Sequence, residues 1–241
     1  MSRIGRVGYP LYKLVWGCVD LLYPPRCCGC GTPNVRLCDD CKVSISLIEP
    51  PICERCGKMI PRRGQCLRCR TNPPQFIAHR SWCMYEGAIR KAIHRLKYYG
   101  DIALGDLLTR PLITLLSEMN WEIDSIVAVP VTKSRAKERG YNQAALLAYP
   151  LSLSAEVVFQ PESLIKTRQV PSQVGLTLEQ RIKNVAGVFE AIPVLVRGKQ
   201  LLIIDDVITS GATMNACATA LLDAGARSVY GLTLARAGFK S

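Results

Sequence analysis

The chain has 241 residues, of which 49% are hydrophobic and 21% charged, a composition typical of one ordinary globular domain plus a small one. No stretch approaches the roughly 18 uninterrupted apolar residues of a membrane span, and the basic start lacks the apolar run of a secretory signal. We therefore expect a cytoplasmic protein with no membrane span. In that reducing compartment, twelve cysteines favour metal binding over disulfides.

The net charge of +12 is concentrated at the front of the chain, where residues 1–80 hold 13 Lys or Arg against 5 Asp or Glu. Such a basic region suits phosphate-rich partners, although it is also a common means of keeping proteins soluble. The aromatic residues among the first 24 positions are Tyr9, Tyr12, Trp16 and Tyr23. They offer either stacking faces for single-stranded DNA or one buried face of an amphipathic helix.

Eight of the cysteines form four C-x-x-C pairs in a segment that repeats itself, with Gly31 and Gly57 directly after the first pair of each half. One pair brings two thiolates to a tetrahedral ion, and two pairs complete a site. We therefore predict two structural zinc ions on sequential ribbons. The ligands are Cys27, Cys30, Cys38 and Cys41, then Cys53, Cys56, Cys66 and Cys69. Cys28 breaks the two-residue spacing and is not a predicted ligand.

Three alternatives stay open for these cysteines: interleaved pairing, one zinc ion with loose thiols, and an iron–sulfur cluster. The segment has few aliphatic residues, so bound metal must supply much of its stability. Four protein thiolates leave no coordination position for water, which argues against metal-assisted hydrolysis. Pro73 and Pro74 mark its end. The expected domains are an amphipathic segment at 1–24, a double zinc ribbon at 25–74 and a larger domain at 75–241.

From residue 76 onward, short β-rich runs alternate with amphipathic helical patterns. This alternation predicts an α/β fold with a mostly parallel sheet and helices on both faces. The expected helices span residues 87–98, 103–119, 138–151, 177–185 and 212–224. The expected strands span residues 125–129, 199–204 and 228–235.

The most informative segment is 201–213, in which four apolar residues predict a central strand, followed by two acids and a hydroxyl-rich loop into a helix. Ligands of open α/β sheets bind beyond the carboxyl ends of strands, and free N–H groups at a helix start favour phosphate. Asp205 and Asp206 repel phosphate but can accept hydrogen bonds from ribose hydroxyls. The segment therefore predicts a ribose 5′-phosphate site. A capped helix beside two exposed acids is the alternative.

The segment is neither a Walker A loop nor a dinucleotide fingerprint, because the required glycines are missing. It resembles the phosphoribosyl-diphosphate (PRPP) motif of type I phosphoribosyltransferases, in which four hydrophobic residues and two acids precede a T/S-S/T-G-x-T/S loop. Asn142 and Gln143 follow Arg-Gly-Tyr, and the last strand ends at Arg236. Together with the Cys-rich front end, these features make the whole chain similar to the ComF family, which is associated with DNA uptake in natural competence.

The resemblance implies a type I phosphoribosyltransferase domain that binds PRPP with Mg²⁺. The implied PRPP-binding residues are Asp205, Asp206, Val207, Ile208, Thr209, Ser210, Gly211, Ala212 and Thr213. It also implies a pyrophosphate loop after an earlier strand, made of Val131, Thr132, Lys133 and Arg135. The expected catalytic residues are Asp205, Asp206, Arg135 and Arg139, because basic groups can offset the charge of a departing diphosphate. A solvated helix start is the alternative for the basic loop.

Two weaker features lie outside these motifs. Gln173, Leu176, Arg181 and Asn184 match positions of a family segment that would form a lid, although a surface loop followed by an exposed helix fits equally well. His94 and Lys97 share one helical face, and a structural histidine is the preferred interpretation.

Two hypotheses of function follow. In the first, the chain binds PRPP and, if active, transfers its phosphoribosyl group to an unknown acceptor, in a role linked to DNA uptake. In the second, it is a PRPP sensor or a factor that binds single-stranded DNA, and its zinc ribbons contact DNA-uptake or recombination proteins. Both acids and a complete loop favour ligand binding, but they do not separate a catalyst from a sensor. The sequence leaves the oligomeric state open.

Overall fold

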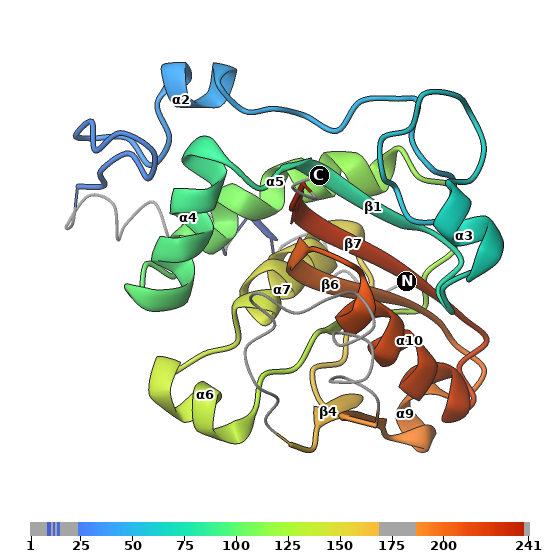
Figure 1. Cartoon of the computed structure of the whole chain (residues 1–241). Coiled ribbons are helices and arrows are strands. Elements are labelled where there is room, and N and C mark those ends of the chain that lie inside the picture. The colour runs from blue at the N-terminus through green and yellow to red at the C-terminus, as the bar shows by residue number, and fades with distance from the viewer. Residues whose placement is uncertain (1–8, 11, 13, 15–23, 169–186, 239–241) are drawn as a thin grey trace.

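The computed structural model describes residues 9, 10, 12, 14, 24–168 and 187–238 (Figure 1). The predicted lid, with Gln173, Leu176, Arg181 and Asn184, and the predicted helix 177–185 lie outside the described residues, as do Trp16 and Tyr23. Within the described part of the chain, no helix is long and apolar enough to cross a membrane.

A parallel sheet of five strands forms the centre of the fold, in the order β1-β7-β6-β2-β3. The strands are β1 (His79–Met84), β2 (Ser125–Ala128), β3 (Val158–Phe159), β6 (Gln200–Ile208) and β7 (Ser228–Arg236). Residues 201–204 of β6 are fully buried, which is typical of a central strand that is covered on both faces. A separate antiparallel pair is formed by β4 (Leu164–Lys166) and β5 (Phe189–Ala191).

Helices cover both faces of the sheet. The connection from β1 to β2 and the connection from β6 to β7 run in opposite directions along the strand order, so right-handed crossovers place their helices on opposite faces. The helices of the first connection are α4 (Gly87–Tyr98) and α5 (Leu104–Ser117), and α10 (Ala212–Asp223) belongs to the second. Figure 1 shows α10 in front of the strands and α5 behind them. The predicted α/β fold is confirmed.

The predicted helix 138–151 is wrong in its boundaries, because the chain forms two helices there. They are α6 (Lys133–Arg139) and α7 (Gln143–Ala155). Gly140 ends α6 with a left-handed φ of 80°, and the Asn142 side chain caps α7 by accepting a hydrogen bond from the Ala144 N–H at 3.0 Å. A glycine with positive φ followed by an N-cap asparagine is an ordinary way to end one helix and begin another.

The Cys-rich region contains only the short helices α2 (Asp39–Val43) and α3 (Leu67–Thr71). Between them, residues 46–48 pair with the edge strand β1. The Ile48 N–H donates to the Trp82 carbonyl at 3.0 Å, and the Met84 N–H donates to the Ser46 carbonyl at 2.8 Å. This pairing covers an otherwise open sheet edge. Figure 1 shows α2 and α3 on opposite sides of the molecule, and residues 46–48 belong to the chain that connects them.

Candidate functional site

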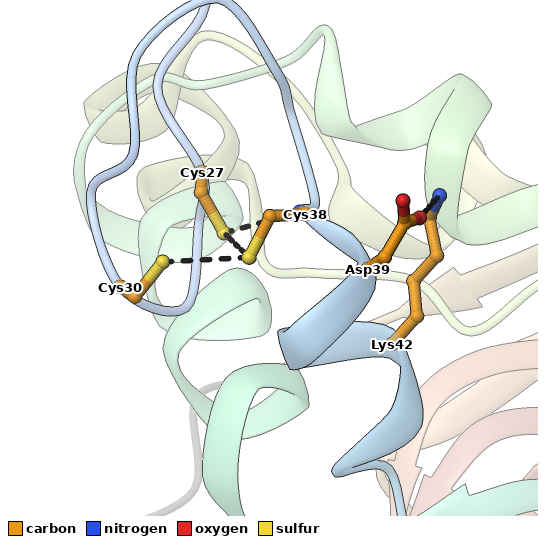
Figure 2. Close-up of polar contacts among 5 residues, drawn as sticks. All are labelled: Cys27, Cys30, Cys38, Asp39 and Lys42. Carbon is orange, nitrogen blue, oxygen red and sulfur yellow. Dashed lines mark hydrogen bonds and ion pairs between the residues drawn. The ribbon is translucent and has the colours of Figure 1, made fainter.

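The four predicted ligands of the first ribbon converge on one point, and Figure 2 shows three of them, Cys27, Cys30 and Cys38. The Sγ atoms of Cys27, Cys30, Cys38 and Cys41 lie within 4.8 Å of one another. Cys38 Sγ is 3.6 Å from Cys27 Sγ and 3.5 Å from Cys30 Sγ. A tetrahedral zinc ion with Zn–S bonds of about 2.3 Å requires sulfur separations of about 3.8 Å. The four thiols therefore fit one structural zinc ion.

The second group of cysteines has the same geometry. The Sγ atoms of Cys53, Cys56, Cys66 and Cys69 lie within 4.8 Å of one another, and Cys56 Sγ is 3.8 Å from Cys66 Sγ. The backbone N–H groups of Cys56 and Cys66 donate to Cys53 Sγ at 3.5 and 3.3 Å. The structure thus groups the eight cysteines sequentially and not in an interleaved arrangement.

The pKa shifts of the cysteines in the first ribbon indicate that they bind a cation. Burial opposes ionisation of Cys27, yet N–H donors of the surrounding backbone lower its pKa to about 6. At Cys41, burial and hydrogen bonding to the other thiols raise the pKa. Four adjacent thiols cannot all ionise unless a cation lies between them, and four thiolates suit zinc. Cys28 lies outside the group, and burial raises the pKa of its thiol to about 11.

The predicted phosphate loop joins β6 to α10. Gly211 is the N-cap residue of α10 and has a φ of 80°, a conformation that glycine adopts without strain. The Ala212 N–H reaches Ser210 Oγ at 3.4 Å, whereas no residue in the described ranges accepts a hydrogen bond from the Gly211 N–H. A small hollow at this turn is lined by Asp205, Thr209 and Thr213. Free amides at a helix start make such a hollow suitable for an anion.

The two acids lie in β6, which extends four residues beyond the predicted strand and pairs Asp205 with Thr233 and Ile208 with Arg236. Successive residues of a strand face opposite sides of the sheet. Asp205 accordingly lines the hollow beside α10, and Asp206 pairs with Lys97 of α4. The structure brings both carboxylates to the carboxyl end of β6 but places them on different faces of the strand.

Lys97 was only a weak candidate in the sequence, but its side chain lies beside these acids. Its Nζ forms an ion pair with Asp206 Oδ2. Burial opposes the charge of Lys97, but the carboxylates of Asp206 and Asp205 more than offset this and raise its pKa. Burial, followed by the negative charge of Asp206, raises the pKa of Asp205 well above its ordinary value.

His94 does not reach the acids. It is exposed and packs against the rings of Tyr98 and Tyr99, with centroid distances of 4.7 and 5.7 Å. The structural histidine is instead His79, which is 0% exposed and lies 3.2 Å from Thr233 Oγ1 through Nε2.

The predicted pyrophosphate loop begins at the same edge of the sheet and then becomes a helix. The Val129 N–H donates to the Ile204 carbonyl at 2.9 Å, so the end of β2 lies beside the acids. Thr132 caps α6 by accepting from the Arg135 N–H at 3.4 Å. Val131 and Thr132 thus lie between strand and helix, while Lys133, Arg135 and Arg139 belong to α6. Arg135 is exposed, and Arg139 lies over the Tyr98 ring at 5.0 Å.

The second zinc ribbon contacts the phosphate loop, which the sequence did not indicate. Arg68 Nη1 donates to the Ser210 carbonyl at 2.5 Å, and Arg236 Nη2 donates to the Cys56 carbonyl. A cavity of about 310 Å³ lies between ribbon and loop, lined in part by Arg68, Ser210 and Arg236. The spacing of residues along the chain carries no signal for contacts of this kind, because the partners are more than 140 positions apart.

We predict that the chain, purified without chelator, holds two zinc ions. Cys27→Ser should reduce the zinc content to one ion, because it removes one of four thiolates. Cys28→Ser is the matched control and should leave two ions. Elemental analysis measures both. Zinc near zero in the parent chain, with all eight thiols titrating freely, would contradict the assignment.

Comparison with known proteins agrees with this two-part architecture. Residues 18–70 match the double zinc ribbon domain family, and residues 108–238 match the phosphoribosyl transferase domain family. DNA utilization protein YhgH of Escherichia coli (strain K12) is 28% identical over 228 residues, which cover 90% of this chain and 99% of that protein. Competence protein ComFC of Bacillus subtilis (strain 168) is 26% identical over 212 residues, 85% of each chain.

Among solved structures, a glutamine phosphoribosylpyrophosphate amidotransferase from B. subtilis aligns with a TM-score of 0.36 and 23% identity. The alignment covers 56% of this chain and 26% of that one. The resemblance noted in the sequence is thus confirmed by a double zinc ribbon, a phosphoribosyltransferase domain and relatives named for competence and DNA utilization. The phosphoribosyl transferase match covers more than half of this chain. The chain therefore belongs to the phosphoribosyl transferase domain family.

Proposed function

We propose that the chain binds PRPP, together with Mg²⁺, at the carboxyl end of β6. The observation that carries the proposal is the junction of β6 with α10, where the turn lies beside Asp205 and the Gly211 N–H has no acceptor among the described residues. The amides suit a phosphate and the carboxylate suits ribose hydroxyls. A ribose 5-phosphate presents both groups in one small molecule.

The residues present also fit a magnesium ion. Mg²⁺ is commonly held by one or two carboxylates together with the phosphates of a substrate. Asp206 is already paired with Lys97, so Asp205 is the carboxylate that we assign to this ion. When bound, Mg²⁺ would offset the charge of the diphosphate.

We further propose that α6 serves the leaving group if phosphoribosyl transfer takes place. A nitrogen nucleophile would form the new bond to the anomeric carbon and lose a proton. The bond from that carbon to the diphosphate would break, and the diphosphate would leave with the electron pair. Arg135 and Arg139 are the basic side chains that we assign to the developing charge. Pyrophosphate release from PRPP, assayed with candidate acceptors, separates this enzyme from a PRPP sensor.

We predict that Asp205→Asn weakens PRPP binding by about 1.5–3 kcal/mol, because it removes a charged acceptor. Asp206→Asn should weaken binding as well, because it removes the carboxylate that pairs with Lys97. Asp223→Asn, at the exposed far end of α10, is the control and should bind as the parent does. Calorimetry in Mg²⁺ measures the affinities. If the parent does not bind PRPP, or if all three variants match it, the site assignment is wrong.

The affinity for PRPP should also depend on pH through Asp205. Its pKa is raised in the free chain, and a ligand that donates hydrogen bonds to the carboxylate favours the charged form. Affinity should therefore fall as the pH drops through this raised pKa and level off above it. Because PRPP itself titrates, the informative quantity is the difference between the parent and Asp205→Asn. Parallel pH profiles for the two proteins would refute the role of Asp205.

A second candidate function is the binding of single-stranded DNA. A cavity of about 1390 Å³ lies between the first zinc ribbon and α4, and its cationic lining consists of Arg26, Arg36, Arg90, Lys91 and Arg95. Tyr99, which is 72% exposed, also lines it. Cations and exposed aromatic rings together suit phosphates and unpaired bases. The relatives named for DNA utilization and competence support the same candidate.

For this candidate we predict that the double substitution Arg26→Ala and Arg90→Ala, at two exposed residues of the cavity lining, weakens oligonucleotide binding. It should also lower the slope of log affinity against log salt by roughly 1.4, since each lost phosphate contact removes about 0.7. Arg62→Ala with Arg63→Ala removes the same charge from an exposed part of the second ribbon and should have little effect. Fluorescence anisotropy over a salt series measures both. Equal losses in the two double variants would indicate diffuse charge and not a site.

A further inference from the structure

The second zinc ribbon forms a hydrogen bond to the backbone of the phosphate loop. Arg68 lies in the turn between the two ligands Cys66 and Cys69, at the start of α3. From there its guanidinium donates a hydrogen bond of 2.5 Å to the Ser210 carbonyl. Metal bound to Cys66 and Cys69 would fix the backbone on both sides of Arg68 and thereby its direction.

The contacted carbonyl belongs to the same peptide group as the Gly211 N–H. The C=O and N–H of a trans peptide are fixed in one plane and point in opposite directions. A cation that binds the Ser210 carbonyl on the ribbon side therefore turns the Gly211 N–H away from the ribbon. Without a Cβ, Gly211 would otherwise allow this peptide to rotate. A charged donor on the carbonyl also polarises the N–H and strengthens it as a donor.

Arg236 gives a second link between the ribbon and the loop. It is 7% exposed, lines the cavity between ribbon and loop, and donates through Nη2 to the Cys56 carbonyl. Its Nε has no hydrogen-bond partner among the described residues. In the sheet, Arg236 pairs with Ile208, the last residue of β6 before the loop. One wall thus joins the cysteine ligands, the end of β7 and the phosphate loop.

The first zinc ribbon makes its contacts elsewhere. In the described part of the chain, Lys91 of α4 donates to the Gly29 carbonyl at 2.8 Å, and Arg95 donates to the Arg26 carbonyl at 3.2 Å. These bonds dock the first ribbon on α4 and not on the phosphate loop. The two zinc ribbons therefore differ in their relation to the ligand site.

We infer that Arg68 is a positioning residue of the 5′-phosphate subsite, and that zinc at the second cluster, but not at the first, controls binding of sugar 5′-phosphates. This inference rests on the proposed PRPP site and deepens it. Loss of zinc from Cys66 and Cys69 would release Arg68, and the Gly211 N–H would no longer be held toward the phosphate. The second ribbon would thus make ligand affinity sensitive to metal supply and to thiol oxidation.

The test uses the zinc-loaded full chain and two probes, ribose 5-phosphate and pyrophosphate with Mg²⁺, titrated by calorimetry. Arg68→Ala should weaken the binding of ribose 5-phosphate about tenfold, which is the effect of one lost hydrogen bond to a charged group. The affinity for pyrophosphate should stay within about twofold of the parent value. Arg70→Ala, on the same short helix, is the matched control and should change neither affinity. Zinc content should stay at two ions in both variants.

A second pair of variants tests the role of the metal. Cys69→Ser should weaken the binding of ribose 5-phosphate as Arg68→Ala does. Cys41→Ser, the equivalent change in the first cluster, should keep this affinity within about twofold of the parent value. If either cysteine variant fails to fold, the comparison of Arg68→Ala with Arg70→Ala still decides the inference.

The outcomes separate this inference from the function on which it rests. If the parent binds neither PRPP nor ribose 5-phosphate, the proposed function fails and the inference fails with it. If the parent binds both but Arg68→Ala behaves like Arg70→Ala, the inference is overturned and the proposed function stands. An equal loss of ribose 5-phosphate and pyrophosphate in Arg68→Ala would show a general disturbance of the site and would also overturn it.

Discussion

The negative charge of two adjacent carboxylates at the end of a buried strand governs the chemistry of the site. Asp206 is 2% exposed and Asp205 precedes it in β6, so their negative charge must be balanced by the protein or by a ligand. Lys97 supplies part of that balance from α4. Burial and the charge of Asp206 raise the pKa of Asp205, so we infer that Lys97 balances the two acids only in part. A ligand that brings hydroxyl donors and a cation would complete it.

The thiols of the zinc ribbons, like the two acids, carry negative charge that needs a cation beside it. Each ribbon holds four thiols that cannot all ionise without a metal ion, and the second stands beside two arginines that reach the phosphate loop and the end of β7. Four thiolates with one Zn²⁺ carry a net negative charge, which offsets these arginines. The Cys-rich region is therefore both a covering for the sheet edge and one wall of the candidate ligand site.

The features predicted from sequence are those that depend on neighbouring residues. The C-x-x-C spacing and the succession of strand, acids, loop and helix are local patterns, and the structure groups their residues as expected. The helix expected at 138–151 fails because Gly140 and Asn142 divide it. Arg68 was missed as a site residue and Lys97 was only a weak candidate, because each reaches its partner across more than 100 positions. The pattern of residues in a short stretch of sequence carries no information on contacts between residues so far apart.

We propose that the end of β6 and the second zinc ribbon form one ligand site. Hydrogen–deuterium exchange of the zinc-loaded chain, with and without PRPP and Mg²⁺, can test this proposal, because bound amides exchange more slowly. We expect slower exchange in residues 209–213 and 66–69 together, and unchanged exchange in residues 27–41. Protection confined to other segments, or no protection at saturating PRPP, would contradict the claim.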